Sequence, residues 1–124
     1  LAGVSVMKPG ASSKDVFAAT LAYIEQHQSE LKTPMAKDAA ASALKRKGYA
    51  LHGLGVDMAE GAPQTFQAGN VLCYEPQFTS GNQAFFVEDT FLITPAGHEV
   101  LNPALPYSPA DIERAMSQPL HSAK

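Results

Sequence analysis

Three short segments of the chain set an imidazole or a carboxylate among apolar residues and glycines. His52 lies in a glycine-rich stretch at 51–55, Glu75 follows the apolar run 71–74, and Glu88 interrupts the apolar stretch 85–93. A carboxylate buried without a partner costs several kcal/mol, so an acid kept in an apolar strand usually faces a cation, a metal or water. One imidazole and two carboxylates form a reasonable ligand set for Mn, Co, Fe or Zn.

An ordinary structural interpretation of the same residues stays open at this point. A single glutamate in a strand lies on a solvated face more often than it is buried, and a histidine beside glycine is more often a turn or core residue than a ligand. Cys73 is predicted to be a small buried core residue. It is the only cysteine, which excludes an intrachain disulfide and a four-cysteine zinc site.

Two helices are predicted in the first 48 residues. Ser12 or Ser13 can cap a helix that runs to about Gln28, with Asp15 in the position of a capping box. Its apolar residues follow helical spacing and form one stripe: Phe17, Leu21 and Ile24.

The second helix is predicted from the Thr33-Pro34 start signal, in which a cap precedes proline at the first helical position. The stretch 35–47 is rich in alanine, and its basic end at 45–47 complements the negative helix terminus. Gly48 can take the left-handed closing position.

Beyond Gly48 the sequence consists of short β-type runs separated by turns. Strands are predicted at 49–51, 71–74, 84–93 and 98–101, the last two forming an antiparallel hairpin, and a short terminal helix at 110–116. Two helices followed by several strands are typical of an α+β fold with helices packed on an antiparallel sheet.

The chemical segments, taken in order, resemble the C-terminal half of the pita-bread metallopeptidases, the family of methionine aminopeptidase, Xaa-Pro aminopeptidase and prolidase. That family carries His-x-x-Gly-x-x-x-His-Glu/Asp, then Gly-Met-Val-Leu-Thr-x-Glu-Pro, then Arg-x-Glu-Asp-Thr-x-x-Val-Thr, and ends in a Gly-x-Glu-x-Leu turn. The chain reads His-Gly-Leu-Gly at 52–55, Gly-Asn-Val-Leu-Cys-Tyr-Glu-Pro at 69–76, Val-Glu-Asp-Thr-Phe-Leu-Ile-Thr at 87–94 and Gly-His-Glu-Val-Leu at 97–101.

The resemblance runs from Leu1 to about Leu105 and fits the Xaa-Pro branch best. It implies that residues 1–124 form a single C-terminal portion of a pita-bread catalytic domain, with helices packed on a curved antiparallel sheet. Residues 1–107 carry the resemblance, and residues 108–124 form a terminal helix and tail.

The resemblance also implies a role for each matching residue. His52 would be a metal ligand, Glu75 a ligand and the general base that activates water, and Glu88 a bridge between two ions. The expected cofactor is a pair of divalent ions, Mn, Co or Zn, which would polarise the scissile carbonyl and lower the pKa of water. Asp89 and Thr90 would support the ligands rather than bind metal.

Two departures from the family pattern reduce the activity expected of this chain. Ala59 occupies the position of the family's second histidine, and losing a donor to a developing oxyanion commonly costs roughly 10²–10³ in rate. The family's two upstream aspartate ligands have no counterpart, since Asp15 lies at a helix start. We therefore expect weak metal binding and little or no peptidase activity from the chain alone.

Three functions remain open from the sequence. The first is part of a hydrolase that cleaves an N-terminal peptide bond before proline; the second is an inactive pita-bread binding or interaction protein. The third is a family relative that acts on a small molecule as a hydrolase or lyase. Ala59 favours the second, whereas Glu75 and Glu88, as acids that are costly to bury, argue against a decayed site.

Composition restricts the partners. A net charge of −3 and a pI near 5.7 disfavour nucleic-acid binding, and no apolar run approaches the roughly 20 residues that span a bilayer.

Because the sequence begins at Leu1, we expect a processed or truncated chain. A half-domain exposes apolar surface, so we expect contact with the remaining half of the catalytic domain, with a partner chain, or with a second copy. Cytoplasmic placement is the default expectation.

Overall fold

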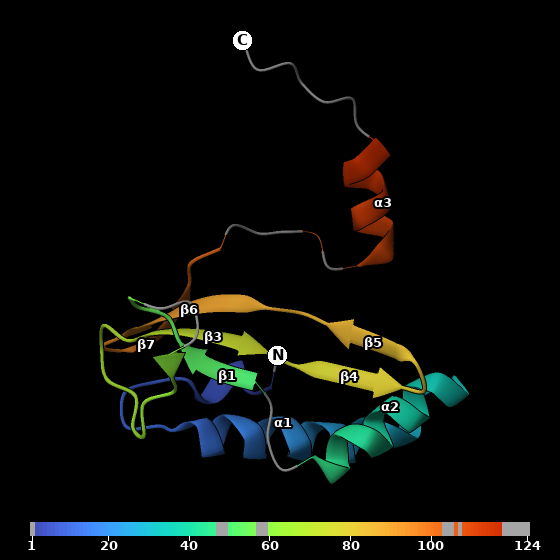
Figure 1. Ribbon diagram of the computed structural model, residues 1–124, viewed down its shortest axis with the longest axis horizontal. Helices are drawn as coiled ribbons and strands as arrows, with labels where there is room; N and C mark the ends of the chain where they lie inside the picture. The colour runs from blue at the N-terminus through green and yellow to red at the C-terminus, as the bar shows by residue number, and fades with distance from the viewer. Residues whose placement is uncertain (1, 47–49, 57–59, 103–105, 107, 118–124) are drawn as a thin grey trace.

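Two helices lie along one side of an antiparallel sheet in the computed structural model of the protein (Figure 1). The structure describes residues 2–46, 50–56, 60–102, 106 and 108–117. The α+β class and the antiparallel sheet predicted from the sequence are both confirmed.

The helices begin where the capping residues predict. Helix α1 (Ser13–His27) starts with the Asp15 carboxylate accepting hydrogen bonds from the Ser12 backbone N–H and from the Ser12 hydroxyl, both at 2.7 Å. These bonds hold the pKa of Asp15 below its ordinary value. Helix α2 (Pro34–Lys45) starts with the Ala36 N–H donating to the Thr33 hydroxyl oxygen at 3.1 Å. Short 3₁₀ segments occur at η1 (Val4–Val6) and η2 (Gln28–Glu30).

The second helix is shorter than predicted. It ends at Lys45, because Arg46 already has an extended backbone, with φ −77° and ψ 135°. Lys47 and Gly48, which were expected to close this helix, lie outside the described residues.

The main sheet has the strand order β2-β1-β3-β6-β7, and all neighbouring strands are antiparallel. A separate hairpin pairs β4 with β5, and helix α3 (Pro109–Ser117) follows the last strand. The strands are β1 (Ala50–Gly53), β2 (Glu60–Gly61), β3 (Val71–Glu75), β4 (Gln77–Ser80), β5 (Gln83–Phe86), β6 (Asp89–Thr94) and β7 (Gly97–Val100).

The strand predicted at 84–93 is wrong as a single element. It is divided into β5, which pairs with β4, and β6, which pairs with β3 and β7, so Val87 and Glu88 connect two different sheets. The hairpin predicted near the end of the chain is confirmed as β6–β7. Strand β1 extends to Gly53, which places His52 in a strand, whereas Tyr49 of the predicted strand lies outside the described residues. Strands β2 and β4 were not predicted.

A hydrophobic core of described residues lies between helix α1 and the sheet. Its buried members include Val16 from α1, Leu72 and Tyr74 from β3, and Phe91 and Ile93 from β6. Every second residue of β3 and β6 therefore faces the helices, as the two-residue period of a strand requires.

One buried hydrogen bond joins the helix to the sheet within this core. The Thr20 hydroxyl donates to the Val16 carbonyl at 2.8 Å, so the Tyr74 hydroxyl must donate to the Thr20 oxygen, which lies 2.6 Å away. Burial raises the pKa of Tyr74, which keeps its hydroxyl protonated.

We predict that Tyr74→Phe and Thr20→Val each lower the free energy of unfolding by about 1 kcal/mol, because each leaves a buried polar partner unsatisfied. The double variant should lose less than the sum, since both partners are then absent. Urea denaturation followed by circular dichroism measures this cycle. Strictly additive losses would show that the hydroxyls do not interact.

Candidate metal centre

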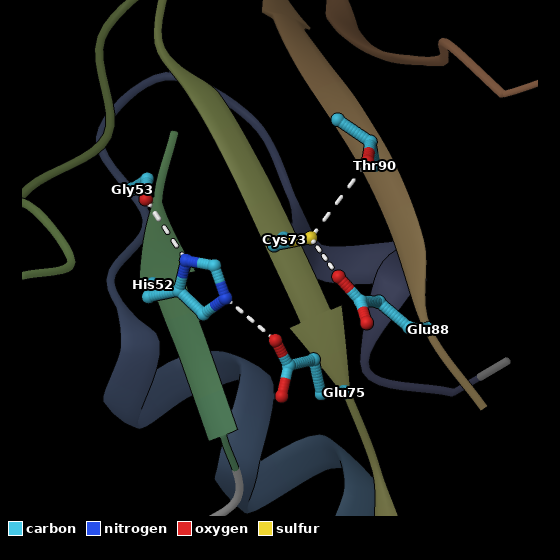
Figure 2. A network of polar contacts seen from close by, with 6 residues as sticks. All are labelled: His52, Gly53, Cys73, Glu75, Glu88 and Thr90. Carbon is cyan, nitrogen blue, oxygen red and sulfur yellow. Dashed lines mark hydrogen bonds and ion pairs between the residues drawn. The ribbon is translucent and has the colours of Figure 1, made fainter. Parts of the chain in front are cut away.

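Four side chains with metal-binding atoms meet on the side of the sheet that faces away from the helices (Figure 2). One atom from each of His52, Cys73, Glu75 and Glu88 lies within 4.8 Å of every other. The convergence of an imidazole and two glutamates expected from the sequence is thus present in the structure. Cys73 is an addition, since the sequence predicted only a core role for it.

Strand pairing explains why these residues meet. His52 of β1 lies opposite Cys73 of β3, and Cys73 lies opposite Thr90 of β6. Because side chains alternate along a strand, this row and Glu75, two residues beyond Cys73, all point away from the helix core. The sequence signal for Cys73 was its spacing of two from Glu75, which places both residues on one strand face.

The His52 ring is oriented by two hydrogen bonds. Its Nδ1 lies 2.9 Å from the Gly53 carbonyl oxygen, which can only accept, so Nδ1 carries a proton. Nε2 lies 2.6 Å from Glu75 Oε1, and the two side chains are 21% and 18% exposed. The Gly53 carbonyl, followed by Glu75, raises the pKa of His52. A ring whose Nδ1–H is held by a carbonyl presents Nε2 as its ligand atom.

Cys73 is buried at the centre of the cluster, with 1% of its surface exposed. Its thiol donates to Glu88 Oε1 at 2.8 Å, and Thr90 Oγ1 lies 3.7 Å from the sulfur. Burial, followed by the hydrogen bond to Glu88, raises the pKa of Cys73 to about 11. Without a metal the thiol is therefore neutral at pH 7.

The two acids are less buried than the sequence argument assumed. Glu75 ends strand β3 and is partly exposed, and Glu88 lies between β5 and β6 and is exposed. The prediction of two acids enclosed in apolar strands is therefore wrong for Glu88. The desolvation cost that argued against a decayed site is smaller than expected.

Asp89 and Asn102 hold the start of β6 next to Glu88. Asp89 is 4% exposed, and its Oδ1 accepts a hydrogen bond from Asn102 Nδ2 at 2.7 Å. Asn102 Oδ1 in turn accepts from the Thr90 N–H at 2.8 Å. The sequence did not identify Asn102, because a single asparagine after a strand is also typical of an ordinary turn.

The segment between β1 and β2 contains the position of the family's second histidine. Ala59 lies outside the described residues. Glu60 accepts a hydrogen bond from the Val56 N–H at 2.9 Å and does not belong to the four-residue cluster.

The sequence pattern of Metallopeptidase family M24 matches residues 1–95. The chain belongs to this family. The resemblance to the pita-bread metallopeptidases is therefore confirmed. No curated protein sequence matches the chain.

Solved structures similar to this M24 chain include aminopeptidases P. E. coli aminopeptidase P with the inhibitor Pro-Leu superimposes with a TM-score of 0.67 at 21% identity, covering 92% of this chain and 31% of the solved chain. The zinc-substituted E. coli enzyme in complex with product gives the same values. Proline aminopeptidase P II from Yersinia pestis gives a TM-score of 0.68 at 21% identity, covering 94% and 32%. The chain thus has the fold of part of aminopeptidase P and spans about a third of the length of these proteins.

The donor atoms of the cluster fit a divalent metal ion. A nitrogen, a sulfur and two carboxylates are the atom types that bind zinc and related ions, and four donors match a tetrahedral site.

Among the described helices, none has the length and apolar character that crossing a membrane requires.

The raised pKa of His52 predicts a pH dependence of stability. A group whose pKa is higher in the folded state adds stability below its ordinary pKa, about 6.5, and this contribution is lost as the pH rises through the folded value. The groups that face His52 are Glu75, Glu88 and Cys73. We therefore expect the metal-free protein to lose unfolding free energy as the pH rises above about 6.5.

Urea denaturation in the presence of a chelator, over a series of pH values, measures this loss. His52→Gln should flatten the profile in this window, whereas Glu25→Gln on the exposed face of α1 should leave it unchanged. An identical profile for His52→Gln would contradict the assignment.

Proposed function

We propose that this chain supplies His52, Glu75 and Glu88 to the metal centre of an M24 hydrolase that cleaves an N-terminal peptide bond before proline. The observation that carries the proposal is the meeting of these side chains on one sheet face, in a chain that belongs to the metallopeptidase family. The similar solved structures, which are aminopeptidases P, support the choice of substrate class.

Each residue has a role that its position allows. His52 donates the Nε2 lone pair, with the ring held by the Gly53 carbonyl. Glu75, partly exposed, binds metal and takes the proton of the attacking water as general base. Glu88 supplies a second carboxylate from the exposed edge of the cluster. Divalent ions bound here would supply Lewis-acid activation of water and of the scissile carbonyl.

The proposed centre is completed by groups outside this chain. Two glutamates offset half of the four positive charges that a pair of divalent ions carries. A dinuclear Mn, Co or Zn centre therefore requires further carboxylates, from the remaining half of the catalytic domain or from a partner chain. The partial coverage of the aminopeptidase P chains supports this.

Titration calorimetry with Mn²⁺ and Zn²⁺ tests the metal centre. We expect one weakly bound ion per chain rather than two tightly bound ions. Glu75→Gln and Glu88→Gln should each weaken binding by at least about tenfold, as removing a metal-supporting group does. Glu25→Gln is the matched control, since Glu25 lies exposed on α1. A chain that binds neither ion would contradict the proposal.

Activity is tested with a peptide that carries proline in its second position. The chain alone with metal should show little or no cleavage. If the coding sequence upstream of Leu1 encodes two aspartates spaced as a strand pair, the longer product should cleave the bond before proline, and Glu75→Gln should abolish this. A longer product that binds metal without cleaving any such peptide would contradict the assignment as a peptidase.

An inactive binding protein on the same fold is the second candidate. It is favoured by Ala59, which cannot donate the hydrogen bond of the family's second histidine. A small-molecule hydrolase or lyase is the third, and the same substrate assay separates it from the peptidase. Cytoplasmic placement stays a prediction.

Self-association or association with a partner also stays a prediction. Phe85 and Phe86 of β5 are 45% and 52% exposed, which is unusual for neighbouring aromatic residues on a monomer surface. We expect sedimentation equilibrium to give a mass above that of one chain, and Phe86→Ser to lower it. A compact monomer at all concentrations would contradict this expectation.

A further inference from the structure

The sulfur of Cys73 is the one member of the cluster that the proposed function leaves unused. It lies on the same sheet face as His52 and Glu75, and its Sγ is 2.8 Å from Glu88 Oε1. Each of the other three residues places a nitrogen or oxygen within 4.8 Å of this sulfur. A core cysteine on the helix-facing side would have none of these neighbours.

The chemistry of the donors bears on which ion the site prefers. A soft thiolate favours zinc and other sulfur-binding ions, whereas a site made only of carboxylates suits manganese or magnesium. Zinc commonly takes four ligands in a tetrahedron, at roughly 2.0–2.3 Å. A tetrahedron of this size holds its donor atoms roughly 3.3–3.8 Å apart. The His52–Glu75 and Cys73–Glu88 pairs, now at 2.6 and 2.8 Å, must separate slightly, and the wider pairs, all within 4.8 Å, must close. The exposed Glu88 side chain, outside any strand, can make that movement without disturbing the sheet.

We propose that Cys73 is a fourth ligand, so that the thiolate, His52 Nε2, Glu75 and Glu88 hold one zinc-type ion in preference to manganese. This inference rests on the metal centre proposed above and adds its metal preference. It concerns the one ion that this chain is expected to bind alone, since the sulfur at the centre of the cluster gives the described residues four donors for a single ion.

Binding is balanced by the release of two protons, one from the Cys73 thiol and one from the hydrogen bond that joins His52 Nε2 to Glu75 Oε1. The S–H bond breaks as the sulfur–metal bond forms, and the proton passes to the Glu88 carboxylate that already accepts the thiol hydrogen bond. From this exposed carboxylate it leaves to solvent. No atom changes oxidation state, and no further reactant is needed.

Cobalt(II) titration of the whole chain under reducing, thiol-free conditions tests the ligand directly. A thiolate bound to cobalt gives an intense near-ultraviolet charge-transfer absorption that nitrogen and oxygen ligands do not give. Cys73 is the only cysteine, so such a band can come from no other residue. We expect the band to appear with one equivalent of cobalt, to vanish when zinc displaces it, and to be unaffected by Glu25→Gln.

Cys73→Ser provides the second measurement. We expect it to abolish the near-ultraviolet band and to lower zinc affinity by at least about tenfold, while manganese affinity changes less. Circular dichroism establishes that this variant is folded. If it unfolds, the cobalt spectrum of the unmodified chain still decides the question, because that spectrum needs no variant.

The outcomes separate this inference from the proposed function. Cobalt binding without the charge-transfer band, together with an unchanged ratio of zinc to manganese affinity in Cys73→Ser, would overturn the sulfur ligand and leave the His52, Glu75 and Glu88 centre standing. A chain that binds none of the three ions would overturn both.

Discussion

The two-residue alternation along strand β3 is the constraint on which the rest of the structure depends. Leu72 and Tyr74 point into the core against α1, and Cys73 and Glu75 point to the opposite face. A shift of one residue in the register would bury the carboxylate and expose the tyrosine. The buried bond from Tyr74 to Thr20 therefore secures both the helix packing and the side of the sheet on which the ligands meet.

The candidate centre combines rigid and adjustable parts. His52 and Cys73 lie opposite each other on paired strands, where backbone hydrogen bonds hold their positions. Glu88 lies in the connection between β5 and β6, exposed, although Asp89 and Asn102 anchor the strand that follows. A site of this kind presents two well-placed donors, and its exposed Glu88 carboxylate can adapt to what is bound.

The sequence was most informative where one local signal determines the structure. The Ser12–Asp15 cap, the Thr33-Pro34 start and the β6–β7 hairpin follow from neighbouring residues and are present. The separation of β5 from β6 could not be predicted, because it depends on β4, a polar strand without apolar alternation. The role of Asn102 depends on its contact with Asp89, thirteen residues earlier, which no local pattern contains.

The bond between His52 Nδ1 and the Gly53 carbonyl has a consequence for how the centre can change. The acceptor belongs to the main chain, so exchanging a neighbouring side chain cannot remove it. The backbone path of strand β1 therefore determines the tautomer of the His52 ring. Substitutions can remove the carboxylates or the thiol from this cluster one by one, yet the imidazole would keep the same nitrogen turned toward the centre of the cluster.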